Sequence, residues 1–130
     1  MHHSKVCHIV IDALPDAADD TVAFWSGMLG LKPRSGFRKN SRYVELEGEL
    51  NNVRVLIQRV EKNPGLHLDI ETDDKRAELA RAEALGAKRK QHIKRWWVMQ
   101  DPAGHGFCIV RPQHEDFPRA ANYWLLTDEQ

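Results

Sequence analysis

Apolar and polar positions alternate in short blocks along the chain, and these blocks predict strands and a helix in a definite order. Residues 6–13 are β-branched and mostly apolar, which is typical of a buried strand. Apolar side chains then recur at helical spacing until Gly30, at Ala18, Val22, Trp25 and Leu29. Turn-rich stretches separate the next three strand candidates, which lie at 31–34, 42–47 and 53–60.

The same order of elements restarts near residue 66. A strand is predicted at 66–71, followed by a helix that Thr72 or Asp73 can cap and Gly86 ends. Three further strands are predicted, at 87–91, 96–100 and 106–110. A repeated order of elements indicates internal duplication. We therefore expect an α+β fold of two tandem βαβββ modules, at about 5–60 and 66–111, followed by a tail at 112–130.

Composition narrows the class of protein. The chain has 130 residues, with 19 basic and 19 acidic side chains, so its formal net charge is zero. This length fits a single domain at 1–130, and the charge balance does not favour partners bound through bulk charge, such as nucleic acid. No apolar run reaches the roughly 18–20 residues of a membrane span, and the start lacks the apolar stretch of a signal peptide. The two cysteines cannot form a disulfide framework. We expect a soluble, cytoplasmic protein without a membrane partner.

Five short motifs in matched order resemble one known superfamily. They are the His8 strand, Phe24-Trp25 with Leu29-Gly30, the strand His67-Leu68-Asp69, the turn Asp101-Pro102-Ala103-Gly104, and Phe107-Cys108. Together they are similar to the vicinal oxygen chelate superfamily, and most of all to its small glyoxalase-like domain proteins. The resemblance implies a cupped mixed sheet with the helices outside, a small molecule or divalent metal in the cup, and a homodimer.

The resemblance also implies a set of metal ligands. The matching positions are His8, Gln58, His67 and Cys108. Imidazole binds zinc, nickel, iron or manganese, but the superfamily's metal enzymes typically have a glutamate where this chain has Cys108. A Cys108 thiolate would favour zinc, whereas a protonated thiol would only pack in the interior. A protein without metal that binds a small molecule and a metal-dependent lyase or isomerase therefore both remain open.

Several other side chains are candidates for the ligand-binding surface. Strand alternation places His67, Asp69 and Glu71 on one face, which is either solvated or a polar wall in which Asp69 orients an imidazole. Trp25 is expected mainly to pack, with its edge able to line the cup. One of the neighbours Trp96 and Trp97 should face the cup, and the other the helix layer.

Four features lie outside this scheme. The segment 88–97 combines five basic residues with two tryptophans, and this pattern allows a surface interaction with nucleic acid as a further alternative. The tail is too apolar to be fully solvated, so we expect it to pack across the domain or onto a second subunit. His2 and His3 could bind metal adventitiously. Asp12, at the end of the first strand, is interpreted as a turn or cap residue.

Overall fold

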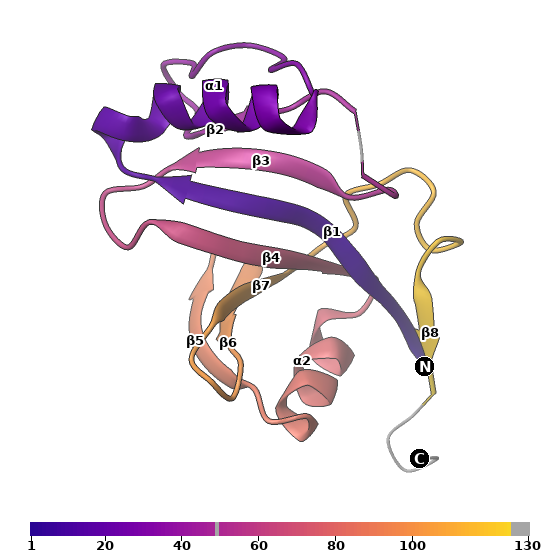
Figure 1. Cartoon of the computed structure of the whole chain (residues 1–130). Coiled ribbons are helices and arrows are strands. Elements are labelled where there is room, and N and C mark those ends of the chain that lie inside the picture. Colours follow the sequence, from indigo (N-terminus) through magenta and orange to yellow (C-terminus); the bar gives the residue numbers. More distant parts are fainter. Residues whose placement is uncertain (49, 126–130) are drawn as a thin grey trace. The chain divides into compact units, whose positions relative to one another are not determined.

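The computed structural model describes residues 1–48 and 50–125 (Figure 1). Its elements are β1 (His2–Ala13), the 3-10 helix η1 (Pro15–Ala17), α1 (Ala18–Leu29), β2 (Tyr43–Glu45), β3 (Arg54–Arg59), β4 (Gly65–Thr72), α2 (Lys75–Ala84), β5 (Lys88–Ile93), β6 (Trp96–Gln100), β7 (Gly106–Val110) and β8 (Asn122–Trp124). The strands pair in both parallel and antiparallel fashion, and the predicted α+β class is confirmed. Neither α-helix in the described ranges is long and apolar enough to span a membrane.

The chain divides into two compact units. Unit 2 is the continuous segment His8–His67, and unit 1 combines Met1–Cys7 with the chain from Leu68 onward. The division falls inside β1 and β4, so each of these strands contributes to both units.

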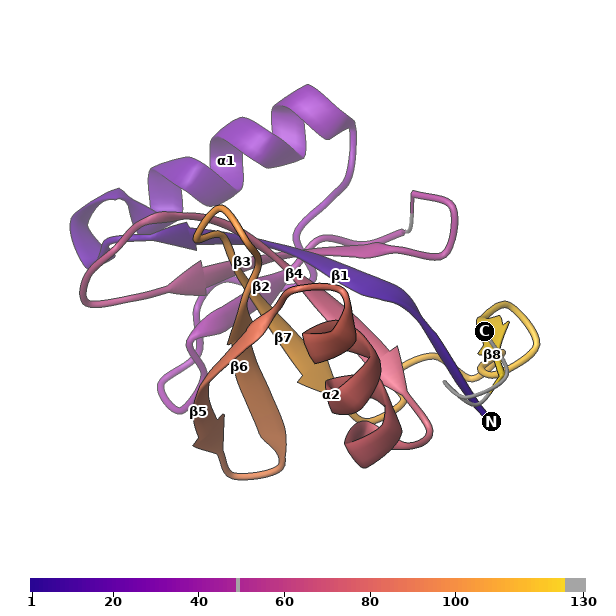
Figure 2. The same ribbon diagram turned by 90° about the horizontal axis from the view of Figure 1, so that it is seen from below.

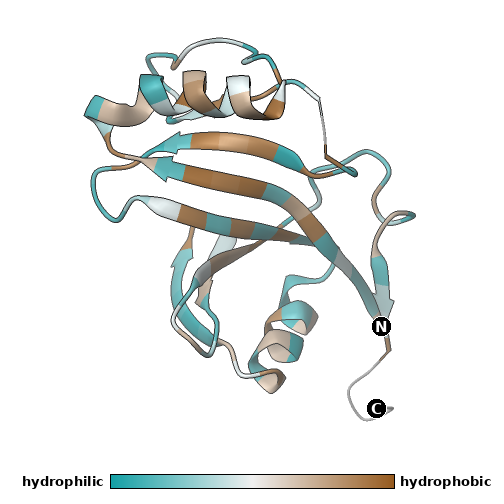
Figure 3. Ribbon diagram, viewed as in Figure 1, coloured by the Kyte–Doolittle hydropathy of each residue, from teal (hydrophilic) through white to brown (hydrophobic). Residues whose placement is uncertain are grey.

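Unit 2 is a three-stranded arrangement with one helix-covered face. β1 pairs in parallel with β3, and β3 pairs antiparallel with β2. The buried cluster lies between the strands and α1, and it is built from Ile11, Val22, Val44, Leu46, Val55 and Ile57. In Figure 3 the central parts of β1 and β3 are accordingly coloured as hydrophobic. Alternation along these strands directs the intervening side chains to the face away from α1.

One strand predicted in this unit is absent. Residues 31–34 form only an isolated bridge between Pro33 and Leu46, so the prediction of a strand there was wrong. Proline has no backbone N–H to donate to a ladder, which explains why the pairing does not extend. The predicted end of the helix is confirmed, because Gly30 adopts a left-handed conformation (φ 70°) directly after α1.

Unit 1 pairs β4, β7, β6 and β5 in that order, with α2 on one face. β4 is parallel to β7, and the other pairs are antiparallel. Leu79 and Ala82 of α2 pack against Met99 of β6 and Ile109 of β7. The helix begins one residue later than predicted, because Asp74 is the cap: its side chain accepts a hydrogen bond of 3.0 Å from the Ala77 amide. Thr72 instead donates to the carbonyl of His3.

The start of the chain and the tail pair with each other in unit 1. β1 begins at His2 rather than residue 6, and residues His2, His3 and Ser4 pair antiparallel with β8. His2 is buried, with its Nε2 2.6 Å from Glu78 Oε1, and His3 Nδ1 lies 2.8 Å from Asp73 Oδ2. Both histidines therefore contribute to the fold, and adventitious metal binding by them stays a prediction. The tail packs on its own chain; its end, at 126–130, lies outside the described residues.

Candidate functional site

A polar cluster lies on the side of strands β4 and β7 that α2 does not cover. Asp69 of β4 is the direct cross-strand partner of Cys108 of β7, and Cys108 is in turn the partner of Val98 of β6. Direct partners point to the same side of a sheet, and their neighbours Met99 and Ile109 point to the α2 side. We call the side that carries Asp69, Cys108 and Val98 the open face.

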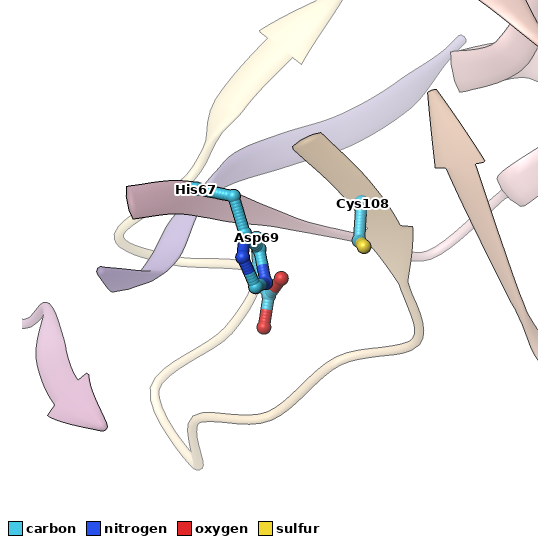
Figure 4. Close-up of side chains that lie close together, drawn as sticks. All are labelled: His67, Asp69 and Cys108. Atoms are coloured by element: carbon cyan, nitrogen blue, oxygen red, sulfur yellow. The ribbon is translucent and has the colours of Figure 1, made fainter. Parts of the chain in front are cut away.

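Three potential metal-ligating side chains converge on this face. One ligand atom from each of His67, Asp69 and Cys108 lies within 4.8 Å of the others, and all three residues are half-buried. Figure 4 shows His67 and Asp69 projecting from β4 and Cys108 projecting from the adjacent β7. An imidazole, a carboxylate and a thiol are the three ligand types that zinc prefers, and three protein ligands are typical of a zinc site that keeps a position for water or substrate.

His67 is oriented by a second carboxylate. Its Nδ1 lies 2.8 Å from Oδ2 of Asp12, which stands at the end of β1 in unit 2. The other oxygen, Oδ1, is buried and accepts no hydrogen bond from any described residue. A carboxylate at Nδ1 fixes the tautomer in which Nδ1 carries the proton and Nε2 bears the lone pair. The role that we expected for Asp69, orienting an imidazole, therefore belongs to Asp12, and the reading of Asp12 as a turn residue was incomplete.

Only part of the ligand set implied by the resemblance comes together. His67 and Cys108 are in the cluster, with Asp69 as the third member. His8 is buried on β1 opposite Arg54, outside this cluster. Gln58 lies opposite Asp12 on β3, but its amide nitrogen donates to the hydroxyl of Tyr43 at 3.1 Å. Gln58 thus extends a polar row across unit 2.

The three tryptophan candidates have different surroundings. Trp25 packs against the buried cluster of unit 2 on the α1 side, because it follows the same helical stripe as Val22 and Leu29. Trp97 packs against the α2-side cluster, where His92 stacks on it with ring centroids 4.5 Å apart. Alternation then places Trp96 on the side of β6 that also carries Val98. Among these three, Trp96 is the one on the open face.

The open face is bounded at one end by the tail. Glu71 follows Asp69 by two positions on β4 and is completely buried. Its Oε1 accepts hydrogen bonds from the backbone amides of Gln113 and His114, and its Oε2 lies 2.9 Å from Nδ1 of His114. Burial alone would raise the pKa of Glu71, but these hydrogen bonds bring the pKa below its ordinary value. The carboxylate is therefore charged, and it anchors the start of the tail.

Sequence reasoning missed Asp12 and His114 as partners of site residues. Asp12 did carry a signal, because it shares a face of the first strand with His8 and Val10. His114 carried none, since it stands in the tail, where no periodic pattern constrains it.

The chain resembles proteins of one family in its sequence and several solved structures in its fold. The profile of a family described as the glyoxalase-like domain matches residues 8–110. Among curated proteins, none matches the sequence. A methylmalonyl-CoA epimerase from Mycobacterium tuberculosis is similar in structure, with a TM-score of 0.56 and 14% identity over 85% of this chain and 89% of that chain.

Two further structures share the fold. The methylmalonyl-CoA epimerase from Streptomyces coelicolor, in complex with 2-nitronate-propionyl-CoA, gives a TM-score of 0.57 and 14% identity over 85% of this chain and 98% of that chain. An extradiol ring-cleaving dioxygenase from B. fuscum gives a TM-score of 0.50 and 13% identity over 96% of this chain and 35% of that chain. At these identities the likeness concerns the fold alone.

Proposed function

Because this chain belongs to the glyoxalase-like domain family, we propose that it binds a small, oxygen-bearing molecule on the open face of strands β4 and β7. The observation that carries the proposal is the convergence of His67, Asp69 and Cys108 within 4.8 Å on a face that α2 does not cover. A half-buried group of an imidazole, a carboxylate and a thiol is a candidate functional site, because such groups are often gathered where a ligand binds. The adjacent Val98 and Trp96 supply apolar surface, as small-molecule sites generally combine both kinds of side chain.

The same cluster supports a divalent metal at this site. Its donors fit zinc, and the carboxylate of Asp12 behind His67 supplies the second layer of support that metal-bound histidines usually have. When bound, zinc would act as a Lewis acid on an oxygen of the ligand. In that case His67 would coordinate through Nε2, since Nδ1 faces Asp12, and Cys108 would coordinate as the thiolate.

The side chains of the cluster would also act on the ligand directly. Asp12 holds the proton on Nδ1 of His67, so that Nε2 is the acceptor. The Oδ1 of Asp12 is buried, so a water enclosed beside it, rather than the ligand, is the donor that would satisfy it. The lone pair on Nε2 favours a ligand with a hydroxyl donor, whereas a bound metal would instead take up lone pairs of the ligand's oxygens.

A metal-dependent lyase or isomerase is the second candidate function, favoured by the ligand cluster. The structures named above include epimerases, which are isomerases. A set of imidazole, carboxylate and thiolate differs from the ligand set with two histidines and one carboxylate that iron oxygenases use. We therefore propose an isomerase or lyase in preference to a dioxygenase.

Metal stoichiometry tests the metal site. The whole chain should be stripped and equilibrated in turn with zinc, manganese, nickel and iron, because residues 1–4 contribute to the fold and cannot be removed as a control. His67→Ala is compared with His105→Ala, whose exposed imidazole pairs with Asp101 in the turn before β7. About one zinc per chain, lost in His67→Ala and kept in His105→Ala, supports the metal site. Equal binding by the two variants contradicts it.

A ligand screen tests small-molecule binding separately. Quenching or a shift of tryptophan fluorescence reports occupation of the open face, and Trp96→Phe should remove most of the response while Trp97→Phe retains it. A ligand whose signal depends on Trp97 alone would place binding elsewhere and contradict the proposed site.

We also propose that the protein acts in the cytoplasm as a homodimer. Neither Cys7 nor Cys108 is in a disulfide, which agrees with a reducing compartment. Two exposed apolar side chains one helical turn apart on α1, Phe24 and Met28, support self-association. Light scattering of the purified chain measures the assembly, and a monomer at all concentrations would contradict the dimer.

A further inference from the structure

Three cationic residues belong to or contact the turn between β5 and β6. Lys94 and Arg95 form the two-residue connection between these strands, and Lys75 is the first residue of α2. The Lys75 ammonium group donates a hydrogen bond to the backbone carbonyl of Arg95, which fixes the start of the helix beside the turn. Figure 2 shows the β5–β6 hairpin alongside α2.

Two of these residues occupy positions where a lysine is unfavourable, one because of its backbone conformation and the other because of the helix dipole. Lys94 has a φ of 50°, in the left-handed region where hairpin turns normally use Gly, Asn or Asp. Lys75 lies in the first turn of α2, where the helix dipole favours acidic side chains and disfavours basic ones. Residues that break a local rule are concentrated at functional positions.

Carboxylates do not neutralise this group. Arg34, Arg81 and Arg89 each form an ion pair with a glutamate, whereas Lys75, Lys94 and Arg95 have no such partner within 1–48 and 50–125. Lys94 and Arg95 are both exposed. Like charges at one turn repel one another, and a multiply charged anion bound there would reduce this repulsion.

We propose that Lys75, Lys94 and Arg95 form a binding site for a phosphate-class anion, either free or as part of a phosphorylated ligand. A compact group of charges at one turn matches a compact anion. Single-stranded nucleic acid would instead need aromatic platforms for its bases, and the nearby Trp97 is stacked by His92, with the Arg89 guanidinium 5.2 Å from its ring centroid. This inference is independent of the metal site and of the ligand proposed for the open face.

The test is a calorimetric titration of the whole chain with inorganic pyrophosphate at low salt. Lys94→Asn is the decisive variant, since asparagine tolerates the left-handed backbone and the fold should be kept. We expect Lys94→Asn and Lys75→Gln each to weaken pyrophosphate binding roughly tenfold or more, and Lys62→Gln, which removes an exposed lysine in unit 2, to leave it unchanged.

Several results of the titration would contradict the proposed anion site. Absence of pyrophosphate binding, or equal weakening by Lys62→Gln, overturns the proposal. A single-stranded oligonucleotide that binds more tightly than pyrophosphate, with a steep dependence on salt, would identify a polymer-binding surface and would also overturn it. Retention of pyrophosphate binding by His67→Ala is expected, because the two sites are separate.

Discussion

Oδ2 of Asp12 lies 2.8 Å from Nδ1 of His67, although 55 positions separate the two residues in the sequence. The contact joins the end of β1 to β4 inside unit 2. It makes Asp12 a positioning residue for His67, because it determines which ring nitrogen carries the proton.

Replacing Asp12 with asparagine should therefore weaken metal binding without removing a metal ligand. We expect a loss of zinc affinity of roughly 10- to 100-fold in Asp12→Asn, the range found when such supporting carboxylates are removed. A competition titration measures the affinity, and the nitrogen NMR shifts of the His67 ring report the tautomer. Asp16→Asn, an exposed residue of η1, is the control. An unchanged tautomer in Asp12→Asn would contradict the positioning role.

The thiol of Cys108 should determine which metal is preferred. Cys108→Ser is expected to lower zinc affinity, and Cys108→Glu should shift the preference toward manganese or nickel, because carboxylates are harder ligands than thiolates. Cobalt substitution gives a direct reading, since a thiolate ligand produces a charge-transfer band in the near ultraviolet. If the band persisted in Cys108→Ser, the coordinating sulfur would not be Cys108.

Loss of the buried carboxylate of Glu71 should destabilise the protein in a pH-dependent way. In Glu71→Gln, donors that now face a carboxylate would face an amide, and we expect a cost of about 1–3 kcal/mol in the free energy of unfolding at pH 7. The folded-state pKa of Glu71 is below its unfolded value of about 4.3. Its contribution is therefore complete above that value and is lost as the pH falls through the folded pKa.

Urea unfolding at pH 7 and at pH 3 measures this effect. The difference between the wild-type protein and Glu71→Gln should shrink at the lower pH, whereas the exposed Glu61→Gln should match the wild type at both. A difference that stays constant with pH would show that the charge of Glu71 is not what stabilises the tail.

The cap of α2 should contribute a measurable part of the stability. Asp74→Ala removes the acceptor for the Ala77 amide and should cost about 1 kcal/mol. Thermal unfolding followed by circular dichroism measures the change, with Asp16→Ala as the control, since Asp16 makes no capping hydrogen bond. Equal melting temperatures for Asp74→Ala and the wild type would contradict this assignment of the cap.

Local sequence signals predicted the elements wherever side-chain pattern alone decides them. Strands β6 and β7 have the predicted bounds, and α1 ends directly before the predicted Gly30. The second helix ends at Ala84, with Leu85 as its cap and Gly86 in the left-handed region just after it. The strand at 31–34 failed because Pro33 cannot donate to a ladder, a restriction that outweighs its apolar neighbours. The start of β1 was missed because His2 and His3 become strand only by pairing with β8.

The candidate site was predictable only where the alternation of side chains along one strand determines it. His67 and Asp69 share a face through alternation, and this could be read from the sequence. The addition of Cys108 depends on the register of β4 against β7, and the contact of Asp12 depends on the path of β1; neither follows from periodicity. His8 and Gln58 were chosen by resemblance, and the contacts of Gln58 with Tyr43 show how one side chain can satisfy another instead of a metal.

The pairing of β1 with β8 brings the two ends of the described chain together, since His2 and Trp124 are direct cross-strand partners. The same contacts could therefore form in a chain that begins and ends at different residues. A short linker could close the ends, and new ends could be opened in the exposed stretch at 61–64, between β3 and β4. Such a circular permutant would begin with β4 and finish with β3. His67 and Asp69 would then lie near its first residue, whereas Asp12 and Cys108 would lie in the interior of the rearranged chain.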